Sequence, residues 1–143
     1  MKRLLTSLSA LFICPVFAAD IEQIAEVTHP QLDEMSGIVA STYKDIYWVH
    51  NDSGDSPRIF AIKVDGSVVL PSLVKVLFPD RSSDRWEGYS IDNAWHQDWE
   101  DIAIADGKLF IADVGNNNNA RRDLGVYVVN EPNPNYIHKT RAA

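Results

Sequence analysis

Cysteine is nearly absent from the chain, and its scarcity excludes two kinds of stabilisation. The single cysteine, Cys14, lies within the apolar N-terminal stretch. One thiol cannot close an intramolecular disulfide, and it cannot build a cysteine-rich zinc site. The bulky Ile13 before it is also untypical of a lipid-attachment cysteine. Once the N-terminal stretch is removed, the sequence predicts a domain without thiol, disulfide or cysteine-bound metal.

Long apolar runs are also lacking. The stretch from Leu4 to Phe17 is interrupted by hydroxyl residues and is too short for a comfortable membrane span. Two basic residues precede it, and Val16-Phe17-Ala18 follows as a small-residue cleavage site, which is the pattern of a secretory signal. We expect residues 1–18 to be a signal peptide and 19–143 an exported domain, periplasmic or secreted, with no membrane attachment. A retained anchor or a buried N-terminal strand are the alternatives.

Basic residues are outnumbered: 13 Lys and Arg face 20 Asp and Glu, for a net charge of −7. Cleavage after Ala18 would remove Lys2 and Arg3 and leave 11 basic and 20 acidic residues, a net −9. Such a surface repels phosphate backbones, so we expect no nucleic-acid partner. The excess of carboxylates is compatible with hard cations such as calcium, and solubility explains it equally well.

Helical periodicity is almost missing after residue 18. Short runs rich in β-branched and aromatic residues are bounded instead by Gly, Asp, Asn and Pro, which is typical of strands. Asp65-Gly66 and Asp106-Gly107 separate such runs and predict antiparallel hairpins. The sequence therefore predicts an all-β meander. Its expected strands are Ile21–Thr28, Gly37–Ser41, Asp45–His50, Arg58–Val64, Ser67–Val76, Asp101–Ala105, Lys108–Asp113 and Gly125–Val129.

Two stretches, 34–62 and 98–129, repeat the same order of strand, turn, aromatic strand, polar loop and strand. Matching positions are offset by 64 (Ile38 to Ile102), 63 (Ile46 to Leu109), 61 (Gly54 to Gly115) and 67 (Phe60 to Tyr127). A propeller blade takes about 40–50 residues, so the spacing predicts an insertion at about 79–97. We expect antiparallel four-stranded blades of a β-propeller, although two unrelated hairpins could also share these features.

About two blades cannot close a propeller, because a ring takes roughly four to eight. The sequence therefore predicts an incomplete propeller, either a fragment of a longer protein or a chain whose ring closes between chains as an oligomer. The fragment is the favoured interpretation.

Polar residues follow equivalent strands of the two copies, at 50–55 and 113–119, and 98–101 opens a strand between them. In adjacent blades these connectors would lie on one face, where their oxygens could bind calcium. The alternative is ordinary turn chemistry. The candidate metal ligands are Asn51, Asp52, Glu100, Asp101, Asp113 and Asn116.

Strand alternation places Glu100 on the same face as Ile102 and Ile104, where a carboxylate needs a partner or an ion. No Gly-x-Ser-x-Gly elbow is present, and among the histidines only His50 is a candidate acid or base. Aromatic residues that could stack on a small-molecule or carbohydrate ligand, or else cap the core, are Trp86, Tyr89, Trp95 and Trp99.

Four short segments combine a strand with an acidic, Gly- or Asn-rich end: Met35-Ser36-Gly37-Ile38, His50-Asn51-Asp52-Ser53-Gly54-Asp55, Asp98-Trp99-Glu100-Asp101-Ile102-Ala103 and Ile111-Ala112-Asp113-Val114-Gly115-Asn116-Asn117. Together they resemble secreted bacterial β-propeller proteins of the NHL-repeat-like type, also described as similar to the esterase-like domain of phytases. The resemblance covers roughly Gln31 to Pro132.

The resemblance implies a ring of about six blades with a face that binds calcium. It matches Asp52, Glu100 and Asp113 to acidic ligands of such a site, and it identifies no catalytic residue. Three functional hypotheses follow: a metal-dependent hydrolase of phosphoesters or lactones, a non-catalytic ligand- or protein-binding module, and a truncated inactive fragment. A fold alone cannot choose among them.

Overall fold

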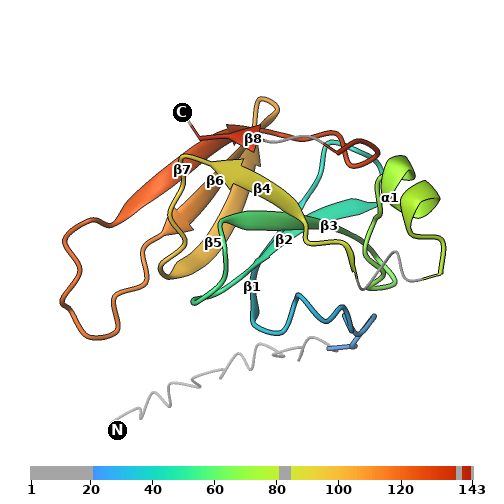
Figure 1. The fold of residues 1–143 in the computed structure, drawn as a ribbon. Coiled ribbons are helices and arrows are strands. Elements are labelled where there is room, and N and C mark those ends of the chain that lie inside the picture. The colour runs from blue at the N-terminus through green and yellow to red at the C-terminus, as the bar shows by residue number, and fades with distance from the viewer. Residues whose placement is uncertain (1–20, 81–84, 138–139, 143) are drawn as a thin grey trace, which may run out of the picture.

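The polypeptide folds into two β-sheets, which a computed structural model describes over residues 21–80, 85–137 and 140–142 (Figure 1). The first sheet has the strand order β1-β2-β3-β4-β8, and the second has the order β5-β6-β7. The elements are β1 (Met35–Ala40), β2 (Ile46–Asn51), β3 (Arg58–Lys63), α1 (Ser72–Leu77), β4 (Tyr89–Asp92), β5 (Trp99–Ala105), β6 (Lys108–Asp113), β7 (Gly125–Asn130) and β8 (Thr140–Arg141). The expected all-β class is confirmed. The expected signal peptide lies outside the described residues.

The hairpin between β5 and β6 forms as the Asp-Gly pair predicts. Asp106 and Gly107 have φ angles of 49° and 69°, the two positive values that a tight hairpin turn of type I′ requires. At Asp65-Gly66 the chain also turns, with Gly66 at a φ of 80°. Beyond that turn, however, only an isolated bridge between Ile62 and Val68 continues the pairing.

Two expected strands are wrong. Ser67–Val76 is not a strand, because the chain leaves the sheet at Pro71 and forms the short helix α1, which buries only Val74. Proline lacks the N–H that a strand ladder needs, yet its fixed φ suits a helix start. Ile21–Thr28 contains no strand either. No described residue of this segment pairs in a sheet.

The stretch 79–97, expected to be an insertion, contains β4. Its residues Tyr89 and Ile91 are buried, and Ile59 of β3 pairs with Tyr89 in antiparallel register. The strands β1 to β4 therefore form a four-stranded antiparallel meander. The short strand β8 was not expected; it adds in parallel through Ile91 and Thr140.

The predicted repeat is confirmed at the level of strand order and register. In each copy the first strand carries a bulge at the same place, between Met35 and Gly37 in β1 and between Trp99 and Asp101 in β5. We call three residues that pair side by side across the three strands of a copy a row. Equivalent residues of the two copies are 64 residues apart in the first strand, 62 in the second and 67 in the third. One such pair of rows is Ile38–Val49–Phe60 and Ile102–Ile111–Tyr127.

The offset of 63 residues expected between Ile46 and Leu109 is one too long. The register makes Lys108 the counterpart of Ile46. Ile46 pairs with Lys63 and Lys108 pairs with Asn130, and these two partners are 67 residues apart, which is the offset of the third strand. Apolar alternation alone cannot fix this position, because Leu109 is the next apolar residue along the chain.

The outer face of the first sheet buries Val49, Phe60 and Ile62 under other parts of the chain, and the two sheets pack together through an inner face of each. On the first sheet this face carries the row Val39–Trp48–Ala61, and on the second the row Ile102–Ile111–Tyr127. Trp48 and Trp99 are fully buried. Within the described ranges no helix is long and apolar enough to cross a membrane.

Candidate functional site

Three carboxyl groups converge where the two sheets meet. Asp52 follows β2 of the first sheet, whereas Asp98 precedes β5 and Glu100 lies within β5 of the second. One oxygen of each lies within 4.8 Å of the others. We call these three residues the acidic cluster. It joins the two copies of the repeat.

A bulge in β5 aims Glu100 into this cluster. Trp99 pairs with Asp113, but the next pair is Asp101 with Ala112, so Glu100 is an extra residue without a partner across the strand. Bulges of this kind redirect side chains, often beside functional sites. The expectation that Glu100 shares a face with the core residues Ile102 and Ile104 is therefore wrong, because Glu100 and Asp101 are both exposed.

Backbone contacts hold the first connector against β5. Ser53 forms an isolated antiparallel bridge with Asp98, and the amide of Trp99 donates to the carbonyl of Asp52 at 3.1 Å. The amide of Asp52 in turn donates to Glu34 at 2.8 Å. These bonds set the spacing of the Asp52 and Asp98 side chains through the main chain.

The second connector reaches the same place through Gly115. A Cβ atom at this glycine would lie 2.1 Å from Asp98 Oδ2 and 2.6 Å from Glu100 Oε1, so any side chain would overlap two carboxylates. The Gly115 amide also donates to the Asp98 carbonyl at 3.1 Å. The polar connectors of both copies therefore lie at one end of the sheets, as the repeat predicted.

The cluster is electrostatically strained. Burial raises the pKa of Asp98 first, and the Asp52 carboxyl raises it further by a shared hydrogen bond and by its charge, against a smaller opposing effect of Arg121. Burial, then the charges of Asp52 and Asp98, also raises the pKa of Glu100. Asp52 Oδ1 is buried and accepts no hydrogen bond from the protein. A shared proton or a cation would relieve this repulsion.

Of the six expected metal ligands, Asp52 and Glu100 belong to the cluster. Asn51 is buried beside it, and its amide donates to Gln31 and Asp55. The carboxylate of Asp101 is exposed and accepts a bond from the next backbone amide at 2.8 Å.

The other two expected ligands, Asp113 and Asn116, hold the connector between β6 and β7. Asp113 is buried and forms an ion pair with Arg121 at 2.6 Å, while Asn116 Oδ1 accepts from the Arg121 amide at 2.9 Å. The structure brings neither side chain into the three-residue cluster. Both are engaged in shaping the loop that presents Gly115.

Asp98 belongs to the cluster but is not among the six ligands that the sequence predicts. The sequence does contain a signal for it, because Asp98 and Glu100 lie on either side of Trp99 and are two residues apart. When Trp99 is buried, the two acids lie on the opposite side of the strand start, because neighbouring side chains alternate. Only the pairing of Ser53 with Asp98 reveals that Asp52 joins them.

His50 and three of the four candidate aromatics are core residues. His50 is fully buried, and burial lowers its pKa so that the neutral ring is favoured. Its ring meets Trp99 edge to face at 5.6 Å. Trp86 and Tyr89 are also buried. Trp95, with 74% of its surface exposed, is the one exposed residue of the four candidate aromatics.

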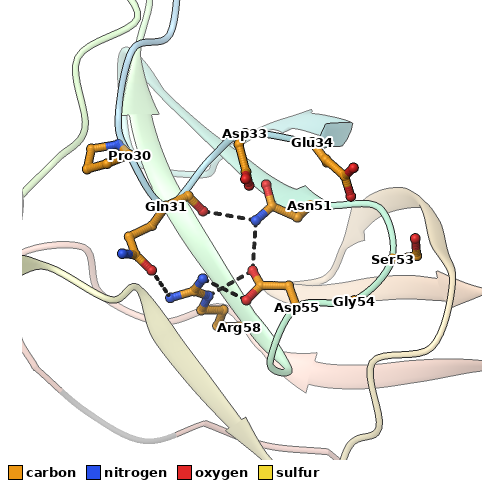
Figure 2. Close-up of a pocket in the computed structure, with 9 residues that line it drawn as sticks. All are labelled: Pro30, Gln31, Asp33, Glu34, Asn51, Ser53, Gly54, Asp55 and Arg58. Carbon is orange, nitrogen blue, oxygen red and sulfur yellow. Dashed lines mark hydrogen bonds and ion pairs between the residues drawn. The ribbon is translucent and has the colours of Figure 1, made fainter.

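A polar pocket of about 390 Å³ is lined by Asn51, Asp55 and Arg58 together with the segment that includes Gln31 (Figure 2). The Asn51 amide donates to Asp55, which pairs with Arg58 at 2.6 Å, and Arg58 donates to the Gln31 side chain. Burial alone would raise the pKa of Asp55, but hydrogen bonds from Arg58, Ser56 and Asn51 outweigh it and lower the value. Charges in this network are thus internally paired, unlike those of the acidic cluster.

Comparisons with protein-family models, with curated proteins and with solved structures find no match for this chain. The site must therefore be interpreted from its own geometry.

Proposed function

We propose that this protein is an exported cation-binding module of the β-propeller type, which takes calcium at Asp52, Asp98 and Glu100. The observation that carries the proposal is the convergence of three carboxylates within 4.8 Å, one of them with a buried oxygen that has no protein partner. Like charges so close repel unless a proton or a cation lies among them.

The donor set fits a hard cation. Calcium prefers carboxylate and carbonyl oxygens and tolerates irregular geometry, and three carboxylates can supply up to about six ligand oxygens. No sulfur or imidazole belongs to the cluster. Bound calcium would supply positive charge between the sheets. The chain's own residues position it: the bulge aims Glu100, and Gly115 leaves space beside Asp98.

A bound ion would fasten one copy of the repeat to the other, because Asp52 belongs to the first connector and Glu100 to the second sheet. Binding without catalysis is thus the function that the geometry supports best. Metal-dependent hydrolysis of phosphoesters or lactones is the second candidate, favoured by the raised pKa of Glu100, because an exposed carboxyl group with a raised pKa is better suited to donate a proton than an ordinary one.

Calorimetric titration with calcium chloride tests the proposal. The wild-type protein should bind one ion, and Asp98→Asn should weaken binding at least about tenfold, equivalent to about 1.4 kcal/mol. Asp106→Asn is the matched control, because it removes the same charge at the opposite end of β5 and keeps a residue suited to a positive φ. Absence of calcium binding by wild type, or an equal loss in both variants, contradicts the proposal.

Turnover assays on a phosphomonoester and a lactone then separate the two candidates. Binding without calcium-dependent turnover supports the non-catalytic module. Turnover that Asp98→Asn abolishes and Asp106→Asn preserves supports the hydrolase.

A further inference from the structure

Trp95 lies in the segment between β4 and β5, with its ring in solvent and its main chain fixed. The residue is 74% exposed. Its amide donates to the Tyr127 hydroxyl at 3.0 Å, and its carbonyl accepts from the Trp99 indole at 2.9 Å. A single exposed aromatic residue is common on protein surfaces, so the surroundings of Trp95 decide whether it has a role.

A second pocket, of about 340 Å³, lies beside Trp95, and we call it the Trp95 pocket. Its walls come from the segment before β5, from the end of β6, from the connector that follows and from β7. Small-molecule pockets of about 300–1,000 Å³ combine aromatic surface with a few polar groups, and this one lies at the lower end of that range. The lining residues are Trp95, Gln97, Asp113, Asp123 and Tyr127.

The polar groups of the Trp95 pocket are oriented but keep unused capacity for hydrogen bonds. Gln97 Nε2 donates to one oxygen of Asp123 at 3.2 Å, and Arg121 Nε donates to the other at 3.3 Å. The Asp123 side chain is still 61% exposed, and a carboxylate has about four acceptor sites. The Tyr127 hydroxyl accepts from Trp95 and, within the described ranges, donates to no residue. Acceptors and a donor are therefore available beside the indole.

The charges around the Trp95 pocket disfavour a charged ligand. Two carboxylates, those of Asp113 and Asp123, share the single guanidinium of Arg121, so the surroundings are net negative and repel anions. Both carboxylates already bond to Arg121, so neither is left without a positive partner for a cation to replace. The pocket thus suits a neutral ligand with several hydroxyl groups and one apolar face.

We propose that the Trp95 pocket binds a neutral sugar, a mono- or disaccharide whose ring stacks on the indole of Trp95. A pyranose ring presents C–H groups on one face, which pack on an aromatic surface, and hydroxyls around its edge. Each hydroxyl both donates and accepts, so it matches Asp123 and Gln97 as acceptors and Tyr127 as a donor. Neither Trp95 nor these three residues belong to the acidic cluster, so the proposal is independent of cation binding.

Nuclear magnetic resonance titrations with glucose, galactose, maltose and cellobiose test the proposal, in buffer with EDTA so that the cation site plays no part. The protein has four tryptophans, and the indole N–H signal that disappears in Trp95→Phe identifies Trp95. We expect at least one of these sugars to shift that signal with a Kd of about 1 mM or lower. Glucose 6-phosphate should bind more weakly than glucose.

Variants locate the binding surface through the backbone amide signals of 123–127. Trp95→Ala should weaken sugar binding at least about tenfold, since it removes the stacking surface, and Asp123→Ala should weaken it by a similar factor. Tyr136→Ala is the matched control, because this aromatic residue is 65% exposed and does not line the pocket. Circular dichroism of each variant verifies that it is folded.

Three results would overturn the proposal. The first is that none of the four sugars shifts the Trp95 signal at about 10 mM, ten times the expected Kd. The second is that Tyr136→Ala weakens binding as much as Trp95→Ala does. The third is that glucose 6-phosphate binds more tightly than glucose, which would indicate an anion site.

Discussion

The first and second sheets share a strand register but differ at the positions where they meet. The residue that opens the first strand is Met35 in one copy and Trp99 in the other, and these pair with Asn51 and Asp113. Met35 is 41% exposed, whereas Trp99 is fully buried between the sheets. The two copies thus share a strand register but lie in different surroundings. The side chain at an equivalent position differs because the residues packed around it differ.

The connectors differ in the same manner. In the first copy the neutral Asn51 stands where the second has Asp113, and each holds the loop that follows it. The short first connector is held by Asp55 and Arg58, and the longer second one by Asp113 and Arg121. Equivalent places in a repeat therefore need not share a chemical role, so a ligand set cannot be copied from one unit to the other.

The largest effect is expected for the junction residue. Trp99→Ala should lower the free energy of unfolding by about 3–5 kcal/mol, because it empties the space beside His50 and Tyr127. Its counterpart Met35→Ala should cost less than about 1 kcal/mol. Urea unfolding of both variants measures the contrast. Equal losses of unfolding free energy in the two variants would contradict the claim that Met35 and Trp99 lie in different environments.

The ion pairs that hold the two connectors come next. Arg121→Ala leaves the Asp113 carboxylate buried, at 4% exposure, without its charged partner, and should be the costlier of the two substitutions. Arg58→Ala should cost less, about 1–2 kcal/mol, since Asn51 and the Ser56 amide still bond Asp55. Thermal unfolding ranks the two, while hydrogen exchange should accelerate in 114–124 only for Arg121→Ala. The reverse ranking would contradict this account of the connectors.

Glu131, just after β7, ties the second sheet to the first. Its carboxylate accepts bonds from Ser41, Thr42 and Trp48; burial raises its pKa, but these bonds outweigh that effect and lower the value. The stability they contribute is therefore full above the ordinary glutamate pKa and is lost as pH falls through the lowered one. Glu131→Gln should cost about 1–2 kcal/mol at pH 7 and almost nothing once the pH lies below that lowered pKa. A cost that does not change with pH would argue against the carboxylate.

The smallest effect, of opposite sign, is expected at the acidic cluster. Because the pKa of Asp98 is raised, stability falls as pH rises through that pKa, and the charged form at neutral pH is disfavoured. Without added calcium, Asp98→Asn should therefore stabilise the fold slightly, by about 0.2–1 kcal/mol. With calcium present the order should reverse. Melting curves with and without calcium check both signs.

Much of the fold could be predicted from sequence, since β1–β3 and β5–β7 have clear apolar runs and turn residues. The helix α1 could not, because the apolar run from Val68 to Val76 is compatible with strand or helix until Pro71 breaks the ladder. Strand β4 was hidden because only Tyr89 and Ile91 carry its pattern, within a stretch of polar and aromatic residues.

The candidate site was predicted only in part, for a physical reason. Asp52 and Glu100 could be found from their loops, but their meeting depends on a bulge and on the Ser53–Asp98 bridge. Neither leaves a periodic signal in the sequence. Asp113 has the composition of a ligand, yet Arg121, eight residues later, pairs with it.

The central claim is that carboxylates from both copies form one cation site. Carbon-13 NMR of the carboxyl groups during a calcium titration tests it most directly. We predict that the signals of Asp52, Asp98 and Glu100 shift along one saturation curve, and that the raised pKa values of Asp98 and Glu100 fall in the calcium-bound protein. Shifts no larger than that of the exposed Asp106, or three separate curves, would contradict a shared site.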